Sequence, residues 1–554
     1  MKRRTFLKSA IATAAATPFF LEGMQVHAST PLKYLAQMPQ ANLNDRILII
    51  CQLFGGNDGL NTIIPSNTDL LPNNYETYVN IRQNIHIPKE KCVNYANINF
   101  APNLGGTVNG ITYSDKGGLV GLLQQGSLAV VQGIGYPYPN LSHFRSTDIW
   151  LSGINSSDPN VRLDTGWVGR YLEKQYPNFP ASLPDDPLAI QFGGFSLALQ
   201  SSKGRMGIEV NDPSNQKGVG TGSSTSELTL DDESKGISYE NEFNFVADIA
   251  SRSNKYAQRV IDAYTAGTTG TKKITGNYAN NSFATQMKNC AALIAGGLNT
   301  KVYVVSLGGF DNHVTQNTDF NVGTHPSLLN QFSDAISQFM YDMVKLNMGD
   351  RVIGLTVSEF GRRPAENGSL GTDHGTSSVQ FIFGTQVNSG AFGYIPNLDP
   401  QGEDSGNLVF NIDYHAVYLE VLTKWFDMTL DDARSMLPDP NLITNIAHLD
   451  PLPVIQTQKN YVNYKPEALK LAIGGNYPNP FANRTTISLD IPQGGLVTLD
   501  ISSIDGKFNR RIFERNFAAG SQSIPVDLDL ASGNYLLIAR SGGMSASKMV
   551  QCVK

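Results

Sequence analysis

The stretch Arg46-Ile47-Leu48-Ile49-Ile50-Cys51-Gln52-Leu53-Phe54, which runs directly into Gly55-Gly56-Asn57-Asp58-Gly59, decides the fold. An unbroken apolar run that ends in glycines is typical of a parallel strand covered on both faces. The same pattern recurs in strands expected at 127–133, 301–307 and 351–357, with helices expected at 283–298 and 328–345. This alternation predicts an α/β fold with a doubly wound sheet.

The chain has 554 residues, enough for two or three domains. We expect a large α/β domain over 44–451, with a polar Ser, Gly and Thr-rich insertion at 201–238. Residues 452–472 have the composition of a linker. From 473 to 554 short alternating strands separated by turn residues predict a small all-β sandwich.

Charge and cysteine content exclude some classes of function. The net charge is -6 and no basic block lies beyond the N-terminus, so nucleic-acid binding has no electrostatic support. None of the 4 cysteines forms a Cys-x-x-Cys pair. Cys51 has the setting of a small core residue, and a Cys51–Cys92 disulfide stays open as an alternative.

The N-terminus predicts export. Residues 1–28 contain a basic start, a short apolar stretch from Ala10 to Leu21 and the small-residue cleavage site Val26-His27-Ala28. Arg3-Arg4-x-Phe6-Leu7-Lys8 resembles a twin-arginine signal, and an ordinary secretory signal is the alternative. No later segment holds the roughly 18 consecutive apolar residues that span a bilayer, so we expect no transmembrane segment in the mature chain.

Acidic and histidine side chains stand beside glycines just after the predicted strands, where open α/β sheets bind ligands. Such residues can converge on one or two divalent metals, with Zn, Mn, Fe, Mg and Ca as the candidates. The predicted metal ligands are Asp58, Asp311, His313, Glu359 and His374, and Asp373 is a predicted substrate contact.

Three of these residues also have a structural alternative. Asp58 lies in Asn-Asp-Gly, a common turn sequence. Glu359 could start a helix and pair locally with Arg362, and His313 could cap a helix. Their shared placement after several strands favours a common site.

The segment Ser142-His143-Phe144-Arg145-Ser146-Thr147-Asp148-Ile149-Trp150 supplies candidates for catalysis. We expect a helix that Ser142 or Asn140 caps. The predicted catalytic residues are His143, Arg145 and Ser146, and the predicted anion-binding residues are Arg170 and Arg362. Helix packing is the alternative for these segments, and His415 is expected to pack in the core.

These motifs resemble a known family. Gly55-Gly56-x-Asp58-Gly59, Ser142-His143-Phe144-Arg145-Ser146, Gly309-Phe310-Asp311-x-His313, Ser358-Glu359-Phe360-Gly361-Arg362 and Gly371-Thr372-Asp373-His374-Gly375 look like the family called domain of unknown function 1501. That family is similar to the alkaline phosphatase and sulfatase superfamily. The resemblance implies an α/β/α sandwich with two metals at the strand ends.

Carried over to single residues, Asp58 matches the first-strand metal aspartate of the superfamily. Asp311 and His313 resemble ligands of the other metal, and His374 resembles the last metal histidine. Glu359-Phe360 stands where the superfamily usually has an Asp-His pair, and no residue soon after the first strand matches the usual nucleophile.

The C-terminal part resembles a second known type. Tyr477-Pro478-Asn479-Pro480-Phe481, Asp505-Gly506-Lys507, Ser532-Gly533-Asn534-Tyr535 and the closing Lys548-Met549-Val550 look like the type A sorting domain of type IX secretion. The resemblance implies that residues 473–554 engage the type IX secretion machinery. The chain would then pass through the periplasm and reach the outer cell surface or the medium.

Two functions from different classes follow. The first is a metal-dependent hydrolase that acts on a phosphate or sulfate ester, either a small anionic ester or one linked to a glycan. In it Arg145, Arg170 or Arg362 would hold the anion, while the metal lowers the pKa of a hydroxyl or water. The second is a non-catalytic extracellular binding protein that keeps the fold with a degenerate metal site.

Overall fold

A computed structural model describes residues 45–456 and 471–554, together with the backbone of residues 19–21 and 24–26. Within these ranges, residues 69–70, 109, 155, 157, 159, 195, 217–255, 399–405, 440–445, 447–448, 478, 492–494, 505–506, 518–519 and 543 are not described. Most of the predicted export signal, residues 217–238 of the predicted insertion and most of the predicted linker therefore lie outside the described residues. Within the predicted signal, β1 (Phe19–Leu21) pairs antiparallel with β2 (Met24–Val26).

The chain forms two compact units. The first comprises residues 1–64, 84–396 and 403–457, and the second comprises 65–83, 397–402 and 458–554. The first unit contains the α/β sheet, and the second contains the C-terminal β-strands, so the predicted α/β class and the all-β C-terminal part are both confirmed.

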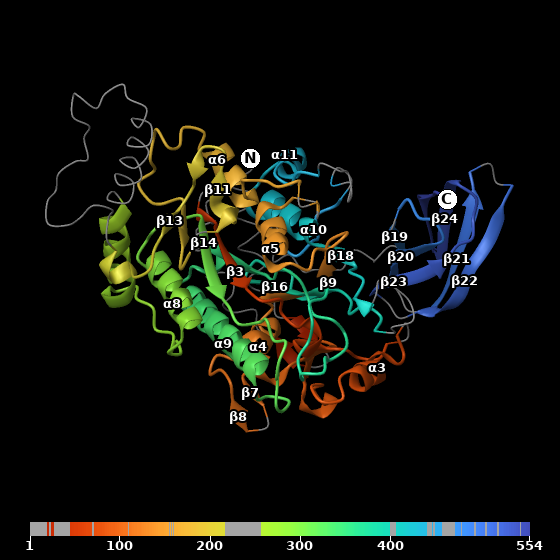
Figure 1. Cartoon of the computed structure of the whole chain (residues 1–554), viewed down its shortest axis with the longest axis horizontal. Helices are drawn as coiled ribbons and strands as arrows, with labels where there is room; N and C mark the ends of the chain where they lie inside the picture. Colours follow the sequence, from red (N-terminus) through yellow and green to blue (C-terminus); the bar gives the residue numbers. More distant parts are fainter. Residues whose placement is uncertain are drawn as a thin grey trace. The chain divides into compact units, whose positions relative to one another are not determined.

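A sheet of nine described strands forms the centre of the first unit (Figure 1). Its order is β13-β10-β14-β3-β15-β16-β9-β17, and β18 pairs with β9. The strands are β3 (Ile47–Leu53), β9 (Leu128–Gly135), β10 (Ala189–Gln191), β13 (Ile208–Glu209), β14 (Val302–Leu307), β15 (Val352–Val357), β16 (Ser378–Gly384), β17 (Gly390–Gly393) and β18 (Ile412–Asp413). The first predicted strand, β3, lies between β14 and β15, and all seven of its residues are buried.

Strand direction determines where the functional loops meet. β3 pairs parallel with β14 and β15. β16 pairs antiparallel with both β15 and β9, so β9 runs in the same direction as β3, β14 and β15. The carboxyl ends of these four strands therefore share one edge of the sheet. Because β16 runs the opposite way, the loop from β15 to β16, residues 358–377, starts and ends at that same edge.

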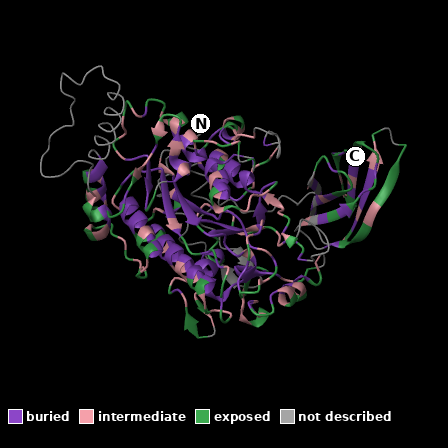
Figure 2. Ribbon diagram, in the orientation of Figure 1, coloured by how far each residue is buried: buried purple, intermediate pink, exposed green. Residues whose placement is uncertain are grey.

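Helices cover both faces of the sheet (Figure 1). One face carries α4 (Gly118–Gln124), α8 (Ser282–Ala295) and α9 (Thr324–Lys345), and the other carries α5 (His143–Ser152), α6 (Trp167–Gln175), α10 (Tyr414–Glu420) and α11 (Leu430–Ser435). On the second face, the strand side chains Ile50, Val131 and Val304 share one buried cluster with Trp167 and Tyr418. Figure 2 shows the sheet and the inner sides of these helices as buried, which is the core of a layered α/β unit.

The structure differs from the sequence prediction in the insertion and at the cysteines. Residues 201–216 of the predicted insertion are described, and β13 within them pairs parallel with β10 as an edge strand of the main sheet. β11 (Gln200–Ser201) and β12 (Gly204–Arg205) form a small antiparallel pair there. Cys51 and Cys92 are both free thiols, so the disulfide alternative is wrong.

Short elements occupy the connections between these strands and helices. Their bounds are β4 (Ile63–Ile64), β5 (Val93–Tyr95), β6 (Ile98–Phe100), β7 (Thr107–Val108) and β8 (Ile111–Thr112). In the part of the chain that the structure describes, no helix is both long and apolar enough to cross a membrane.

The second unit contains α3 (Asn74–Ile81) and two antiparallel sheets, ordered β19-β20-β23 and β22-β21-β24-β25. The strands are β19 (Ala472–Tyr477), β20 (Arg484–Ile491), β21 (Gly495–Ser503), β22 (Asn509–Phe517), β23 (Gly520–Asp527), β24 (Gly533–Ser541) and β25 (Met544–Cys552). Ile487 and Ile524 of the first sheet share one buried cluster with Leu499, Leu537 and Val550 of the second. The two sheets therefore enclose a hydrophobic core of their own, as a sandwich does.

Candidate metal centre

Four loops meet at the shared edge of the sheet. The loop after β3 begins at Gly55, and a Cβ atom added there would lie 2.2 Å from the backbone nitrogen of Asp311 in the loop after β14. Gly371 is equally restricted, since its added Cβ would lie 2.3 Å from the carbonyl carbon of His313. Glycine is required at both positions because the loops approach backbone to backbone.

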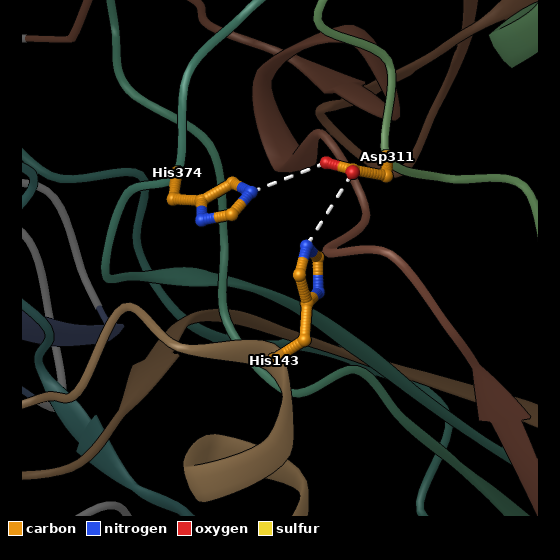
Figure 3. Close-up of side chains that lie close together, drawn as sticks. All are labelled: His143, Asp311 and His374. Atoms are coloured by element: carbon orange, nitrogen blue, oxygen red, sulfur yellow. Dashed lines mark hydrogen bonds and ion pairs between the residues drawn. The ribbon is translucent and has the colours of Figure 1, made fainter.

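The Asp311 carboxylate is the centre of a cluster of three histidines. Its Oδ1 lies 3.0 Å from Nε2 of His313 and 3.2 Å from Nε2 of His374. Its Oδ2 lies 3.5 Å from Nε2 of His143. In Figure 3 the rings of His143, at the start of α5, and of His374, in the loop before β16, point toward this carboxylate. When one ligand atom is taken from each of His143, Asp311 and His374, every pair of these atoms lies within 4.8 Å.

The Glu359 carboxylate orients His143 from the side away from the cluster. Its Oε1 accepts from Nδ1 of His143 at 2.7 Å and from the backbone N–H of Gly55 at 2.8 Å. Glu359 is 3% exposed, so this carboxylate is well shielded from water. Because a carboxylate only accepts, Nδ1 of His143 carries the proton and Nε2 of the neutral ring holds a lone pair.

The other two histidines are oriented in the same way. Nδ1 of His374 lies 2.8 Å from the carbonyl oxygen of Leu141, which can only accept. Nδ1 of His313 lies 3.2 Å from Oδ1 of Asp373. Both rings therefore direct the lone pair of Nε2 toward the cluster in their neutral form, and these two Nε2 atoms lie 2.9 Å apart.

In this arrangement the Nε2 atoms of the three histidines and the Asp311 carboxylate are all hydrogen-bond acceptors that face one another. Three lone-pair nitrogens surround a carboxylate, and Nε2 of His143 is buried without a hydrogen-bond partner. A buried acceptor with no donor is costly. A divalent cation bound by Nε2 of His143, Nε2 of His374 and the Asp311 carboxylate would satisfy these three groups at once, and Nε2 of His313 lies beside Asp311 and His374. Hydrogen bonding of metal-bound histidines through their second nitrogen is the usual pattern in metal sites.

Nearby groups keep Asp311 ionised. Burial would raise the pKa of Asp311, but the hydrogen bond from Arg362 and the positive charge of Arg362 outweigh it and lower that pKa to about 2. Nη2 of Arg362 donates to Oδ1 of Asp311 at 2.6 Å. Burial lowers the pKa of His374, which favours the neutral form that binds a metal.

The Phe360 ring packs against the rings of His143 and His374. It is 2% exposed, and its ring centroid lies 4.8 Å from that of His143 and 4.5 Å from that of His374. Phe360 occupies the position where the resemblance implies a metal histidine. The side chain there packs against two candidate ligands instead of binding a metal itself.

The structure brings seven of the predicted site residues together. They are His143, Asp311, His313, Glu359, Arg362, Asp373 and His374. Several of them have positions that differ from their predicted roles. His143, predicted as a catalytic residue, directs its ring nitrogen at Asp311, and Glu359, predicted as a ligand, holds His143 from behind.

Asp58 lies in a different network. Its Oδ1 accepts from the backbone N–H groups of Leu60 and Asn61, as the cap of a short 3-10 helix at Gly59–Asn61. Its Oδ2 accepts from the Gln316 amide at 2.5 Å. Both carboxylate oxygens of Asp58 are thus committed to the turn and to Gln316, which corresponds to the turn alternative given above.

The predicted anion-binding arginines donate hydrogen bonds to backbone carbonyl groups instead. Arg145 donates to the carbonyl oxygens of residues 156, 158 and 161. Arg170 donates to those of residues 152, 165 and 436. Arg362 binds the carbonyl oxygens of residues 55, 56, 310 and 372 as well as Asp311. Each guanidinium group binds several backbone carbonyl oxygens, so none of the three is placed as a free anion site.

Ser146 is not placed as a nucleophile. It is fully buried on α5, and its hydroxyl contacts the Tyr136 hydroxyl at 3.1 Å and the carbonyl oxygen of Asn140. His415 is fully buried as well, and its Nδ1 lies 2.6 Å from Oδ1 of Asp413. That position agrees with the expected core role of His415.

Sequence reasoning missed two partners of the cluster. The Leu141 carbonyl, which orients His374, leaves no signal in the sequence because any residue supplies a backbone carbonyl. Phe360 was noted as a departure from the family pattern, but its contact with two rings depends on how the loops fold.

Comparisons with solved structures give low similarity. A Bacteroides fragilis protein described as a candidate sulfatase, yidJ, gives a TM-score of 0.31 at 9% identity, over 83% of this chain and 87% of that one. The lipoteichoic acid synthase LtaP from Listeria monocytogenes gives 0.24 at 10% identity, over 66% and 75%. The alkylpurine DNA glycosylase AlkC from Pseudomonas fluorescens gives 0.12 at 14% identity, and this chain covers 31% of its length.

One family model matches part of the chain by sequence. No curated protein matches the chain. The family model described as "Protein of unknown function (DUF1501)" matches residues 190–420. The matched segment contains Asp311, His313, Glu359 and His374, whereas His143 lies before it.

Proposed function

We propose that this chain is a metal-dependent hydrolase of phosphate or sulfate esters. The observation that carries the proposal is the convergence of Nε2 of His143, His313 and His374 on the Asp311 carboxylate, with Nε2 of His143 buried and without a hydrogen-bond donor. Acceptors gathered in this way are arranged for a cation, and the metal would be held at the sheet edge where α/β proteins bind their ligands.

The donor set narrows the choice of metal. Imidazole nitrogens suit Zn and Fe, whereas Mg and Ca prefer a full shell of oxygen ligands. Two imidazoles and one carboxylate, with the third imidazole beside them, therefore favour Zn, Fe or Mn over Mg or Ca. A bound divalent metal would lower the pKa of a water molecule and stabilise charge that develops on the ester.

The chain's own residues prepare this site. Glu359 and the Leu141 carbonyl fix the tautomers of His143 and His374, so that both rings present Nε2. Arg362 holds Asp311 in its ionised form. Because the Ser146 hydroxyl is bound to Tyr136, water is the nucleophile in this proposal.

A non-catalytic binding protein with a degenerate metal site is the second candidate. The observation that favours it is that the predicted anion-binding arginines, such as Arg170, are committed to backbone carbonyls. The site would then lack the groups that hold an anionic ester for turnover.

Elemental analysis and an ester screen test the proposal. We expect about one Zn, Fe or Mn per chain, and release of p-nitrophenol from p-nitrophenyl phosphate or p-nitrophenyl sulfate. His374→Ala should lose both, while His86→Ala, which changes a histidine outside the cluster, should keep both. Metal without turnover on any ester, or absence of metal from freshly purified protein, would contradict the hydrolase and favour the binding protein.

We also propose that the chain is exported and delivered to the outer surface, with residues 473–554 as the part that the type IX secretion machinery handles. The N-terminal signal and the C-terminal motifs in the sequence support this proposal. The separate hydrophobic core of the C-terminal strands is compatible with it.

A further inference from the structure

A wide, solvent-open cavity of about 580 Å³ on the surface begins at the residue that follows His313. It lies between the segment 314–318 and the first two turns of α9. A volume of this size is in the range that binds small organic molecules. Its polar lining consists of Thr315, Thr318, Thr324, Ser327 and Gln331.

One wall of this cavity is joined to the loop that carries His374. The backbone N–H of Thr315 donates to the carbonyl oxygen of Ser369 at 2.9 Å, and that of Gln316 donates to the carbonyl oxygen of Leu370 at 2.9 Å. His313 precedes one of these segments and His374 follows the other. The cavity wall is therefore continuous with the two segments that carry these histidines.

The backbone at this wall is strained. Thr315 has a φ of 44° and Leu370 has a φ of 59°, in the left-handed region. A β-branched residue such as threonine is rare there, and such strain persists where the surroundings fix it, often at functional sites. The paired hydrogen bonds between the two segments supply that fixation.

The lining has the chemistry of a sugar site. The polar groups are hydroxyls and one amide, which both donate and accept hydrogen bonds, and none of the lining residues carries a charge. Val314 and Leu328 add apolar surface. A sugar ring presents hydroxyl edges and apolar C–H faces, whereas a second ionised group on the substrate would find no counter-charge among these lining residues.

We infer that this cavity binds an uncharged sugar unit, to which the ester that reacts at the metal cluster is attached. The inference relies on the proposed hydrolase for the reacting ester, but the sugar subsite itself needs no metal. Binding energy from such a non-reacting part is what an enzyme uses to orient the reacting group.

Ser327 offers a sharp test with a matched control. Ser327 and Ser282 are both exposed serines in the first turn of a helix, and each accepts from a glutamine four residues later at 3.4 Å. Ser327 lines the cavity, and Ser282 begins α8. Ser327→Trp should fill the cavity, while Ser282→Trp makes the same change elsewhere.

The measurement is saturation-transfer NMR on the full chain in EDTA with glucose, galactose, mannose, xylose, fucose and N-acetylglucosamine at millimolar concentration. We expect at least one sugar to bind, Ser327→Trp to weaken it by about tenfold or more, and Ser282→Trp to leave it unchanged. Thr318→Trp, on an exposed loop position, serves as a second cavity variant if Ser327→Trp does not fold.

The outcomes separate the two proposals. Absence of binding by every sugar, or binding that both cavity variants leave intact, would overturn the sugar subsite. Sugar binding in a protein that cleaves no ester would support the subsite and contradict the hydrolase. Ester cleavage without sugar binding would support the hydrolase and contradict the sugar subsite.

Discussion

The Glu359 carboxylate and the His143 ring are joined by a hydrogen bond of 2.7 Å, on the side of the ring that faces away from Asp311 and the other candidate metal ligands. The same carboxylate oxygen accepts the backbone N–H of Gly55, which fixes its position. Glu359 thus decides which nitrogen of His143 faces Asp311. A residue in this position contributes to metal affinity without touching the metal.

Glu359→Gln should lower metal affinity by roughly 10- to 100-fold, in the range seen when such outer partners are changed. The glutamine oxygen can still accept from Gly55, so the fold should survive, but the neutral amide makes His143 a weaker ligand. Competition with a chelator measures the change.

Glu366→Gln is the control for that variant. Glu366 also accepts backbone N–H groups, those of Asn84 and Ile85, but it makes no contact with the cluster. The metal affinity of the Glu366→Gln variant should equal that of the unchanged chain. Equal affinities for all three proteins would show that Glu359 has no part in the site.

Metal removal should lower the thermal stability of the α/β unit. A ligand that binds the folded state alone stabilises it by about 2.7 kcal/mol at a free concentration 100-fold above its Kd. EDTA should therefore lower the Tm of the unchanged chain by several degrees. His143→Ala should start from the lower Tm and show no response to EDTA, and differential scanning fluorimetry records both. A response to EDTA that His143→Ala preserves would place the metal elsewhere.

The position of the site could be predicted from the sequence, but the roles within it could not. Asp311, Glu359 and His374 were placed near one another because the carboxyl ends of parallel strands share an edge. Asp58 follows the central strand as expected, but its carboxylate is directed into its own loop and toward Gln316. Residue type and place along the strand do not determine which way a short side chain points.

The strand β16 shows a second limit. Its antiparallel direction returns the loop 358–377 to the edge where His143 and Asp311 lie, which brings His374 into the cluster. Apolar runs in a sequence are alike for parallel and antiparallel strands in a buried sheet, so the direction of β16 depends on the whole fold. Buried arginines such as Arg170 are likewise hard to foresee, because their partners are backbone carbonyls far away in the chain.

A buried carboxyl outside the site predicts a pH effect on stability. Burial raises the pKa of Glu420 to about 7, against a hydrogen bond from the backbone N–H of Ile455 that lowers it. A raised pKa means that the folded state favours the protonated acid. This stabilising contribution is present below the ordinary pKa of 4.5 and is lost as pH rises through about 7.

Glu420→Gln should therefore stabilise the chain by on the order of 2 kcal/mol at pH 8 and have little effect at pH 4.5. Denaturant unfolding in EDTA, at both pH values, measures the difference without any contribution from metal. The exposed Glu209, changed to glutamine, is the control and should show no such dependence on pH. A stabilisation that is equal at both pH values would mean that Glu420 ionises normally in the folded chain.

Deletion of residues 473–554 should abolish delivery to the cell surface and leave the α/β unit folded. Every residue of the proposed metal cluster lies before this segment, between His143 and His374. The C-terminal strands bury their own core, which includes Leu499 and Leu537, so their loss leaves the core of the α/β sheet intact. The shortened chain should keep its bound metal, unfold cooperatively and accumulate in the periplasm.

The control for the deletion is Leu537→Asp, which places a charge in the fully buried core of the C-terminal strands. If the folded β-domain is what the secretion machinery handles, this full-length variant should also remain in the periplasm with its metal bound, because a buried unpaired charge unfolds a small domain. Cell fractionation and elemental analysis of the periplasmic protein measure both effects. Surface delivery of the shortened chain would contradict the sorting role, and an insoluble shortened chain would show that the α/β unit depends on the C-terminal strands for its own folding.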